Sequence, residues 1–232
     1  MKKLTLHCSD IILSIPELGI PPGFGAALLV DPGTPIPSLR GSGRAAYIEE
    51  GIIRVTARGG AHGGAIVGYR SKGWIVGDLL PNSATPFPLM ASAVTRCTIR
   101  NATTSGISFL SPAEREVFLG HVAAMYACEI EAMIQREAEL YTRSPMDRMC
   151  LFIREFAERC GTPGEGGTTQ LRFPVRQVEL SRYLHLSPEH VNRMIHRLRD
   201  SDIIKDLKWP LITINTSALH SLIEASETQE LA

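Results

Sequence analysis

One segment of the sequence, from Leu186 to Lys205, carries side chains suited to recognition by hydrogen bonds and charge. Residues three and four positions apart share one side of a helix, because an α-helix has about 3.6 residues per turn. The polar and cationic residues that share one side here are Glu189, Asn192, Arg193, His196 and Arg197. Their side chains offer directional donors and acceptors, so this side of the helix can read the surface of a partner.

Apolar residues in the same segment predict the helix that positions this polar face. The i, i+3, i+4, i+7 spacing of one buried stripe is found at Val191, Met194, Ile195 and Leu198. Ser187 is a favourable N-cap, Pro188 suits the first turn, and Glu189 is stabilised at the positive end of the helix dipole. We therefore expect a helix over residues 188–200.

A shorter amphipathic stretch, Val175 to Leu184, precedes this helix. Only His185 and Leu186 separate the two, and two helices joined by so tight a turn form a helix-turn-helix. His185 lies where the first helix must end, at a position that favours positive φ, and histidine tolerates that conformation moderately well.

The residues on both sides of the helix pair predict short strands. Residues 170–173 alternate in polarity, and residues 203–214 read as two strands around a turn at 208–210. Between Arg172 and Lys208 there are eight Lys or Arg residues against five Asp or Glu, although the whole chain has a formal charge of zero. A strand, a helix pair and a hairpin with a local positive charge are typical of a winged helix-turn-helix that faces phosphates.

The stretch VRQVELSRYLHLSPEHVNRMIHRLRDSDIIK resembles the DNA-binding segment of the cyclic-AMP receptor protein and fumarate-nitrate reduction regulator (CRP/FNR) superfamily of transcription regulators. Its recognition helix carries E-x-x-S-R or E-x-x-G-R. Here the motif reads Glu189-His190-Val191-Asn192-Arg193, with Asn192 in place of Ser or Gly. The resemblance implies that bases are read by Ser187, Glu189, Asn192 and Arg193.

Each class of DNA contact has its own chemistry. Arg193 is suited to donate to guanine O6 and N7, and Glu189 to accept from cytosine N4. Contacts to phosphates position a protein on DNA without specifying sequence. We expect such contacts from Arg176, Arg182, Arg197 and Lys208.

The whole chain has 232 residues, of which 44% are hydrophobic and 21% charged, so it can bury one core and has room for two. We expect no signal peptide and no membrane span, because no run of eighteen apolar residues occurs. The five cysteines, at positions 8, 97, 128, 150 and 160, form no C-x-x-C pair, as expected of reduced thiols in the cytoplasm.

Composition divides the chain into three predicted parts, which together give an α+β fold. Residues 1–110 hold most of the Gly and Pro between short β-branched runs and predict a β-roll or small barrel, which the resemblance implies is a sensor domain. Residues 111–143 predict one long helix with Pro112 in its first turn, and residues 144–232 hold the winged module. This order matches the CRP/FNR superfamily, and the resemblance covers about residues 45–214.

The long helix carries a heptad pattern typical of a coiled-coil seam. The alternative is a helix that packs on its own β-domain. Members of the superfamily are homodimers through this helix, which places two recognition helices about 34 Å apart and implies a palindromic operator. The resemblance also implies RNA polymerase as a partner. The predicted dimer residues are Leu119, Ala123, Tyr126, Ile130, Met133 and Leu140.

The segment YRSKGWIVGDLLPN resembles the turn that opens the superfamily's cyclic-nucleotide cassette, with Gly73, Gly77 and Asp78 at the matching positions. The cassette needs an arginine and a hydroxyl for the cyclic phosphate. Here Phe87-Pro88 lies near the expected place, and no arginine occurs between residues 72 and 96. We therefore expect a degenerate sensor that binds neither cyclic AMP nor cyclic GMP.

Other readings of the chain remain open. Haem would need ligands such as His7 and Cys8 with His62 or His121, a single thiol could act as a redox switch, and the one N-terminal cysteine is too few for an iron-sulfur cluster. A cupin-type metal enzyme needs an H-x-H pair, whereas the β-region offers only His62. A dimer that uses its winged module for protein contacts is the third alternative. We expect no enzyme activity and no resident metal.

Overall fold

The computed structural model describes residues 11–16, 18–36, 43–57, 65–77, 89–172, 177–208 and 211–230. They divide into two compact units, Met1–Arg136 and Glu137–Ala232, which are described separately below. The division falls inside the long helix. The domain boundaries after residues 110 and 143 therefore stay a prediction.

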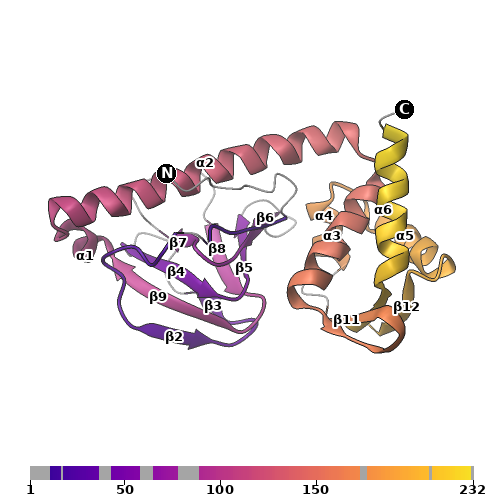
Figure 1. Cartoon of the computed structure of the whole chain (residues 1–232), viewed down its shortest axis with the longest axis horizontal. Coiled ribbons are helices and arrows are strands. Elements are labelled where there is room, and N and C mark those ends of the chain that lie inside the picture. Colours follow the sequence, from indigo (N-terminus) through magenta and orange to yellow (C-terminus); the bar gives the residue numbers. More distant parts are fainter. Residues whose placement is uncertain are drawn as a thin grey trace. The chain divides into compact units, whose positions relative to one another are not determined.

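The N-terminal unit contains two β-sheets (Figure 1). The first has the order β1 (Ile12–Leu13), β6 (Ala65–Arg70), β5 (Ile53–Ala57), β8 (Leu89–Ala93) and β3 (Pro35–Ile36). The second has the order β2 (Ala27–Val30), β9 (Cys97–Thr103), β4 (Arg44–Glu50) and β7 (Ile75–Gly77). All these pairs are antiparallel except β1 with β6. The short helix α1 (Thr104–Ser108) follows β9.

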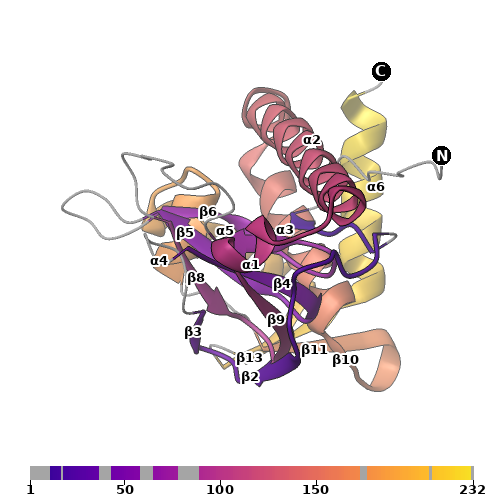
Figure 2. The ribbon, with the colours of Figure 1, turned by 90° about the vertical axis from the view of Figure 1, so that its left-hand side faces the viewer.

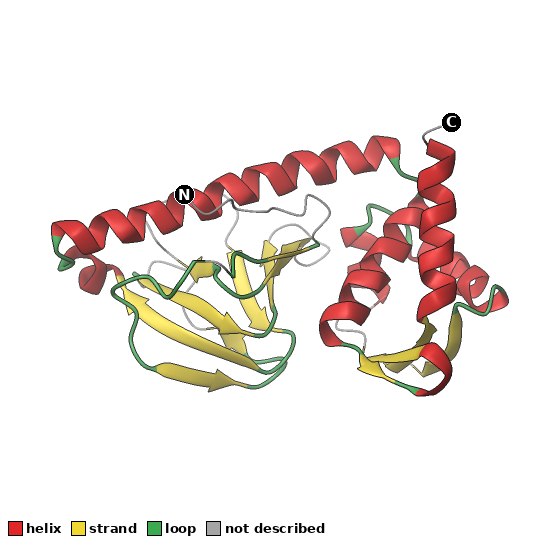
Figure 3. Cartoon of the chain, in the orientation of Figure 1, coloured by secondary structure: helices red, strands yellow, loops and turns green. Residues whose placement is uncertain are grey.

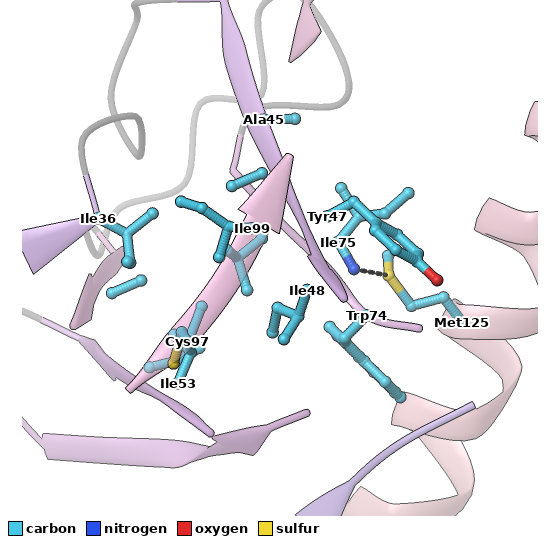
Figure 4. Close-up of a cluster of buried hydrophobic side chains, with 14 of the residues drawn as sticks. Ile36, Ala45, Tyr47, Ile48, Ile53, Trp74, Ile75, Cys97, Ile99 and Met125 are labelled. Carbon is cyan, nitrogen blue, oxygen red and sulfur yellow. Dashed lines mark hydrogen bonds between the residues drawn. The ribbon is translucent and has the colours of Figure 1, made fainter. Parts of the chain in front are cut away.

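Strand β4 is buried on both faces, because four successive residues, 45–48, are buried. Successive side chains of a strand point to opposite faces. In Figure 4 Ile48 lies among Ile53, Cys97 and Ile99, whereas Tyr47 lies beside Met125 of the long helix. The core therefore continues from the sheets to the helix that covers them.

The long helix α2 (Pro112–Thr142) has 31 residues and lies alongside the strands in Figures 1 and 2. It begins as predicted, because the Glu114 carboxylate accepts from the Ser111 backbone N–H at 2.9 Å and Pro112 occupies the first turn. One face is buried against the strands at Phe118, His121, Met125 and Cys128. The reading of α2 as a helix packed on its own β-domain is therefore confirmed for this face.

The C-terminal unit places helices around a small sheet (Figure 3). Its sheet has the order β10 (Thr162–Pro163), β11 (Thr168–Arg172), β13 (Leu211–Asn215) and β12 (Ile204–Lys208). Its helices are α3 (Pro145–Cys160), η1 (Glu165–Gly167), α4 (Gln177–Tyr183), α5 (Pro188–Asp200) and α6 (Thr216–Glu230). The predicted helix pair and hairpin are confirmed. Within the first predicted helix, Val175 and Arg176 lie outside the described residues.

Two features of this unit were not predicted above. The segment GTPGEGGTTQ, whose composition is typical of a surface loop, forms a hairpin, because β10 pairs with β11 and positive φ at Gly166 and Gly167 closes the turn between them. Helix α6 was not anticipated. It is held by the burial of Leu219 and Ile223, which lie four positions apart on one face.

Both helices of the helix-turn-helix end on a residue in the left-handed conformation. His185 has φ 56° after α4, and Asp202 has φ 57° after α5. The Leu186 N–H donates to the Ser181 carbonyl at 2.8 Å, and the Ile203 N–H donates to the Leu198 carbonyl at 2.9 Å. These are Schellman motifs, in which glycine is the usual residue. The positive φ predicted at His185 is confirmed.

We expect His185→Gly to raise the free energy of unfolding by about 0.5–1 kcal/mol, because relief of the left-handed strain outweighs the added freedom of the unfolded chain. Urea unfolding of the full chain, followed by circular dichroism, measures the change. The control His185→Val should lower the same free energy, because a β-branched residue tolerates positive φ least. Destabilisation by glycine as well as by valine would contradict this account of the turn.

Candidate nucleic-acid interface

Helix α5 presents the polar face that its sequence predicts. Its N-cap is Ser187, whose hydroxyl accepts from the His190 backbone N–H at 3.2 Å, and Pro188 occupies its first turn. The apolar stripe is buried at Val191, Met194, Ile195 and Leu198. The outward face is exposed at Glu189, Asn192, Arg193, His196 and Arg197.

The core of the C-terminal unit fixes the rotation of α5. Leu180 and Leu184 of the preceding helix and turn are buried, and the ring of Tyr183 lies 5.1 Å from that of Phe152 on α3. Phe152 in turn lies 4.7 Å from Phe156. Rotation of α5 would pull its buried stripe out of this core, so the outward residues are held outward.

Glu189 is suited to accept hydrogen bonds at neutral pH. The pKa of its carboxyl is lowered by a hydrogen bond from its own backbone N–H, by the Ser187 hydroxyl and by the charge of Arg193. An ionised carboxylate only accepts, whereas the Arg193 guanidinium only donates. One turn of α5 therefore offers an acceptor and a donor side by side.

The structure describes three of the four residues predicted to contact phosphates. Arg182 and Arg197 are exposed on α4 and α5, and Arg176 lies outside the described residues. The Lys208 side chain is 81% exposed and lies 3.5 Å from the Asp206 carboxylate, a surface pair that is weak in water. The roles of these residues stay predictions.

The two described glycines of the predicted cassette are required by the backbone conformation. Gly73 has φ 88° and Gly77 has φ 125°. A Cβ at Gly77 would lie 2.6 Å from the Arg44 carbonyl, so no larger residue fits there. The rest of the predicted cassette, Asp78, Phe87 and Pro88, lies outside the described residues.

A cavity of about 250 Å³ lies between the strands and α2 in the N-terminal unit. Its described lining includes an opposite-charge pair, in which Arg70 Nε donates to Glu129 Oε2 at 3.0 Å and Arg70 Nη2 donates to Glu129 Oε1. Arg70 Nη1 donates to the Tyr69 carbonyl at 2.8 Å. The charge of Arg70 is thus balanced within the wall. Apolar side chains form most of the lining: Val55, Val67, Trp74, Ile75, Val76, Leu89 and Met125.

The described histidines and cysteines do not gather into a group that could hold a metal ion. His121 is buried, its Nε2 lies 2.7 Å from the Gly73 carbonyl oxygen, and burial lowers its pKa. His7, Cys8 and His62 lie outside the described residues, and among the described residues no three His, Cys, Asp or Glu side chains gather. Burial raises the pKa of the Cys150 thiol to about 12 and that of Cys160 to about 11, which keeps both unreactive near neutral pH.

The predicted dimer residues of α2 are exposed or half-buried. Leu119, Ile130 and Met133 are 55%, 57% and 61% exposed, and Tyr126 is 45% exposed. Ala123 is also exposed, and Leu140 is half-buried. Length and composition would let α2 cross a membrane. The buried face of α2, however, makes polar contacts within the N-terminal unit, from His121 to Gly73 and from Glu129 to Arg70, as in a helix of a folded domain.

Comparison with known proteins identifies the C-terminal unit. Residues 147–222 match the family model of the Crp-like helix-turn-helix domain. A comparison with curated protein sequences gave no match.

Solved structures match the fold of nearly the whole chain. TTHA1359, a CRP/FNR family transcriptional regulator from Thermus thermophilus, is 19% identical, with 87% of this chain and 100% of that chain covered and a TM-score of 0.65. FixK2 from Bradyrhizobium japonicum is 19% identical, with 85% and 96% covered and a TM-score of 0.60. The c-di-GMP responsive regulator CLP from Xanthomonas campestris is 16% identical, with 83% and 94% covered and a TM-score of 0.64.

The resemblance to the CRP/FNR superfamily is therefore confirmed by two independent comparisons. One concerns the sequence of the winged module, and the other concerns the arrangement of sheets, long helix and helix-turn-helix. The chain carries a Crp-like helix-turn-helix domain at residues 147–222, and its fold is similar to that of CRP/FNR family regulators.

Proposed function

We propose that the chain is a homodimeric, sequence-specific transcription regulator that reads a palindromic operator through α5 and has lost cyclic-nucleotide binding. The observation that carries the proposal is the outward face of α5, where ionised Glu189 lies one turn before Arg193 above a buried apolar stripe. In this role the chain acts in the cytoplasm, on double-stranded DNA and with RNA polymerase, and is not an enzyme.

Base reading follows from the groups at the start of α5. Arg193 donates to O6 and N7 of a guanine, and Glu189 accepts from N4 of a cytosine, so together they read neighbouring base pairs. Asn192 supports a further amide contact, and Ser187 lies at the helix N-terminus, where a hydroxyl and backbone N–H groups face the nucleic acid. Arg182, Arg197 and Lys208 contact phosphates.

Dimerisation is supported by the exposed stripe of α2. Large exposed apolar patches mark interfaces, and the heptad spacing of this stripe suits a second copy of the same helix. A two-fold axis makes the interface self-complementary and repeats α5 once per half-site. A palindromic operator matches this symmetry.

Loss of cyclic-nucleotide binding is supported by the cavity of the N-terminal unit. A cyclic phosphate needs a free cation, whereas the guanidinium of Arg70 already binds Glu129 and the Tyr69 carbonyl. Among the described residues, the rest of the lining is mostly apolar, which is poorly suited to a buried anion. Regulation by this unit, where it occurs, depends on another class of effector.

The first test is selection of bound sequences from a random duplex pool by the ligand-free protein at near-physiological salt, which suppresses binding to phosphates alone. We expect a palindrome with half-sites about one helical turn apart. Added cyclic AMP should change neither the motif nor the affinity. Selection of no motif would contradict sequence-specific binding, and a motif that needs cyclic AMP would contradict the degenerate sensor.

Arg193→Ala should weaken binding to the selected duplex by about 1–3 kcal/mol, because one bidentate base contact is lost. Fluorescence anisotropy with selected and scrambled duplexes measures the two affinities. The matched control is Arg197→Ala on the same helix, which should weaken both affinities equally and reduce the salt dependence. An equal effect of the two substitutions on specificity would refute the assignment of Arg193.

Ile130→Asp should weaken the dimer at least about a hundredfold, because a symmetric interface would bury two unpaired carboxylates. Analytical ultracentrifugation measures the dimer dissociation constant. The control is Ala138→Asp, at an exposed position about 100° around α2 from the stripe. A dimer that tolerates Asp at position 130 would show that the stripe is not the interface.

A further inference from the structure

Arg148, in the first turn of α3, joins the ends of two other helices. Its Nη1 donates to the carbonyls of Leu140 at 3.2 Å and Arg143 at 3.1 Å, at the end of α2. Its Nη2 donates to the Leu184 carbonyl at 3.2 Å, just after α4. All four residues belong to the C-terminal unit. One side chain thus connects the long helix to the helix-turn-helix.

The contact suits an arginine. The last carbonyls of a helix have no partner within the helix and lie at its negative end, so a cation that donates to them is stabilising. The guanidinium is planar and carries five N–H donors in a fixed fork, which lets one residue serve carbonyls from two elements. Burial lowers the pKa of Arg148 without removing its charge at neutral pH, so these hydrogen bonds are charge-assisted.

On the α4 side, the contact lies close to the base-reading residues. Only His185 and Leu186 separate Leu184 from Ser187, the N-cap of α5. This turn has little freedom, because the Leu184 N–H donates to Leu180 at 2.9 Å and the Leu186 N–H donates to Ser181 at 2.8 Å. A shift of the Leu184 carbonyl therefore shifts the start of α5.

On the α2 side, the corner between α2 and α3 is also fixed. The Ser144 N–H donates to Asp147 Oδ2 at 3.2 Å, and the Asp147 N–H donates to Ser144 Oγ at 3.2 Å, which forms a capping box. Arg143, directly after α2, pairs with Glu139 in the last turn of that helix at 3.7 Å. Helix α2 is continuous from Pro112 to Thr142 and carries the proposed dimer stripe.

We propose that Arg148 is a positioning residue for DNA recognition, which couples the last turn of α2 to the helix-turn-helix turn and so sets the orientation of the base-reading face of α5. The proposal rests on the proposed function, because it concerns how the reading face is held. Arg148 contacts no base in this account and acts through Leu184.

The test compares Arg148→Gln with the charge-matched control Arg154→Gln on the same helix. Dissociation constants are measured for the selected and a scrambled duplex. For Arg148→Gln we expect the ratio of specific to non-specific affinity to fall about tenfold, which corresponds to charge-assisted hydrogen bonds of ordinary strength. The control should keep the wild-type ratio. Arg148→Lys should restore only part of it, because lysine keeps the charge and lacks the fork.

Hydrogen exchange separates a positioning role from a merely structural one. The amides of residues 184–187 should exchange faster in Arg148→Gln, while the amides of the β11 and β13 strands keep their protection. A lower melting temperature with an unchanged affinity ratio would overturn the proposal. If Arg148→Gln does not fold, the same comparison is made with Arg148→Lys, and an unchanged ratio there would also overturn it.

Failure of this inference differs from failure of the proposed function. If the wild-type chain selects no DNA sequence, sequence-specific recognition fails and the positioning role fails with it. If the wild-type chain selects a sequence and Arg148→Gln keeps full specificity, only the role of Arg148 is wrong.

Discussion

Burial of one apolar stripe on α5 is the constraint on which the reading face depends. Because Val191, Met194, Ile195 and Leu198 are buried, the residues on the opposite side of α5 face outward. Their rotation is then set by the packing of α3 and α4 beneath them rather than by any contact of their own. Exposed polar groups on a rigid helix lose little freedom on binding, which favours specific recognition.

Helix α2 has two faces with different tasks. One face packs on the strands through Phe118, Met125 and Cys128, and it makes polar contacts through His121 and Glu129. The other face exposes an apolar stripe at heptad spacing. The same helix can therefore pack on the N-terminal sheets and take part in a dimer interface, and its last turn contacts Arg148. In the proposed regulator, α2 therefore links the N-terminal sheets, the dimer interface and, through Arg148, the helix-turn-helix.

Helices α2, α4 and α5 could be predicted because their signals are local. Caps such as Ser187 and Ser111, and apolar residues at helical spacing, lie within a few positions of the elements that they define. The positive φ at His185 was also predictable, since the chain must turn sharply between two amphipathic helices. The family model and the solved folds agree with these elements.

The remaining features depend on contacts between distant residues. Arg70 and Glu129 are 59 positions apart, and Arg148 and Leu184 are 36 apart, so no periodicity brings them together. The hairpin of β10 and β11 was not predicted, because its glycines signal a turn and do not show which strands the turn joins. Helix α6 has an apolar pair at Leu219 and Ile223, and one pair at helical spacing is too weak a pattern to predict a helix at residues 216–230.

The most direct test of the central claim concerns a single atom of the DNA. The guanine assigned to Arg193 in the selected duplex is replaced by 7-deazaguanine, which lacks the N7 acceptor, and dissociation constants are measured for wild type and Arg193→Ala. The account predicts that wild type loses affinity on this replacement, whereas Arg193→Ala binds both duplexes equally. An equal loss for the two proteins would contradict the claim that α5 reads this base through Arg193.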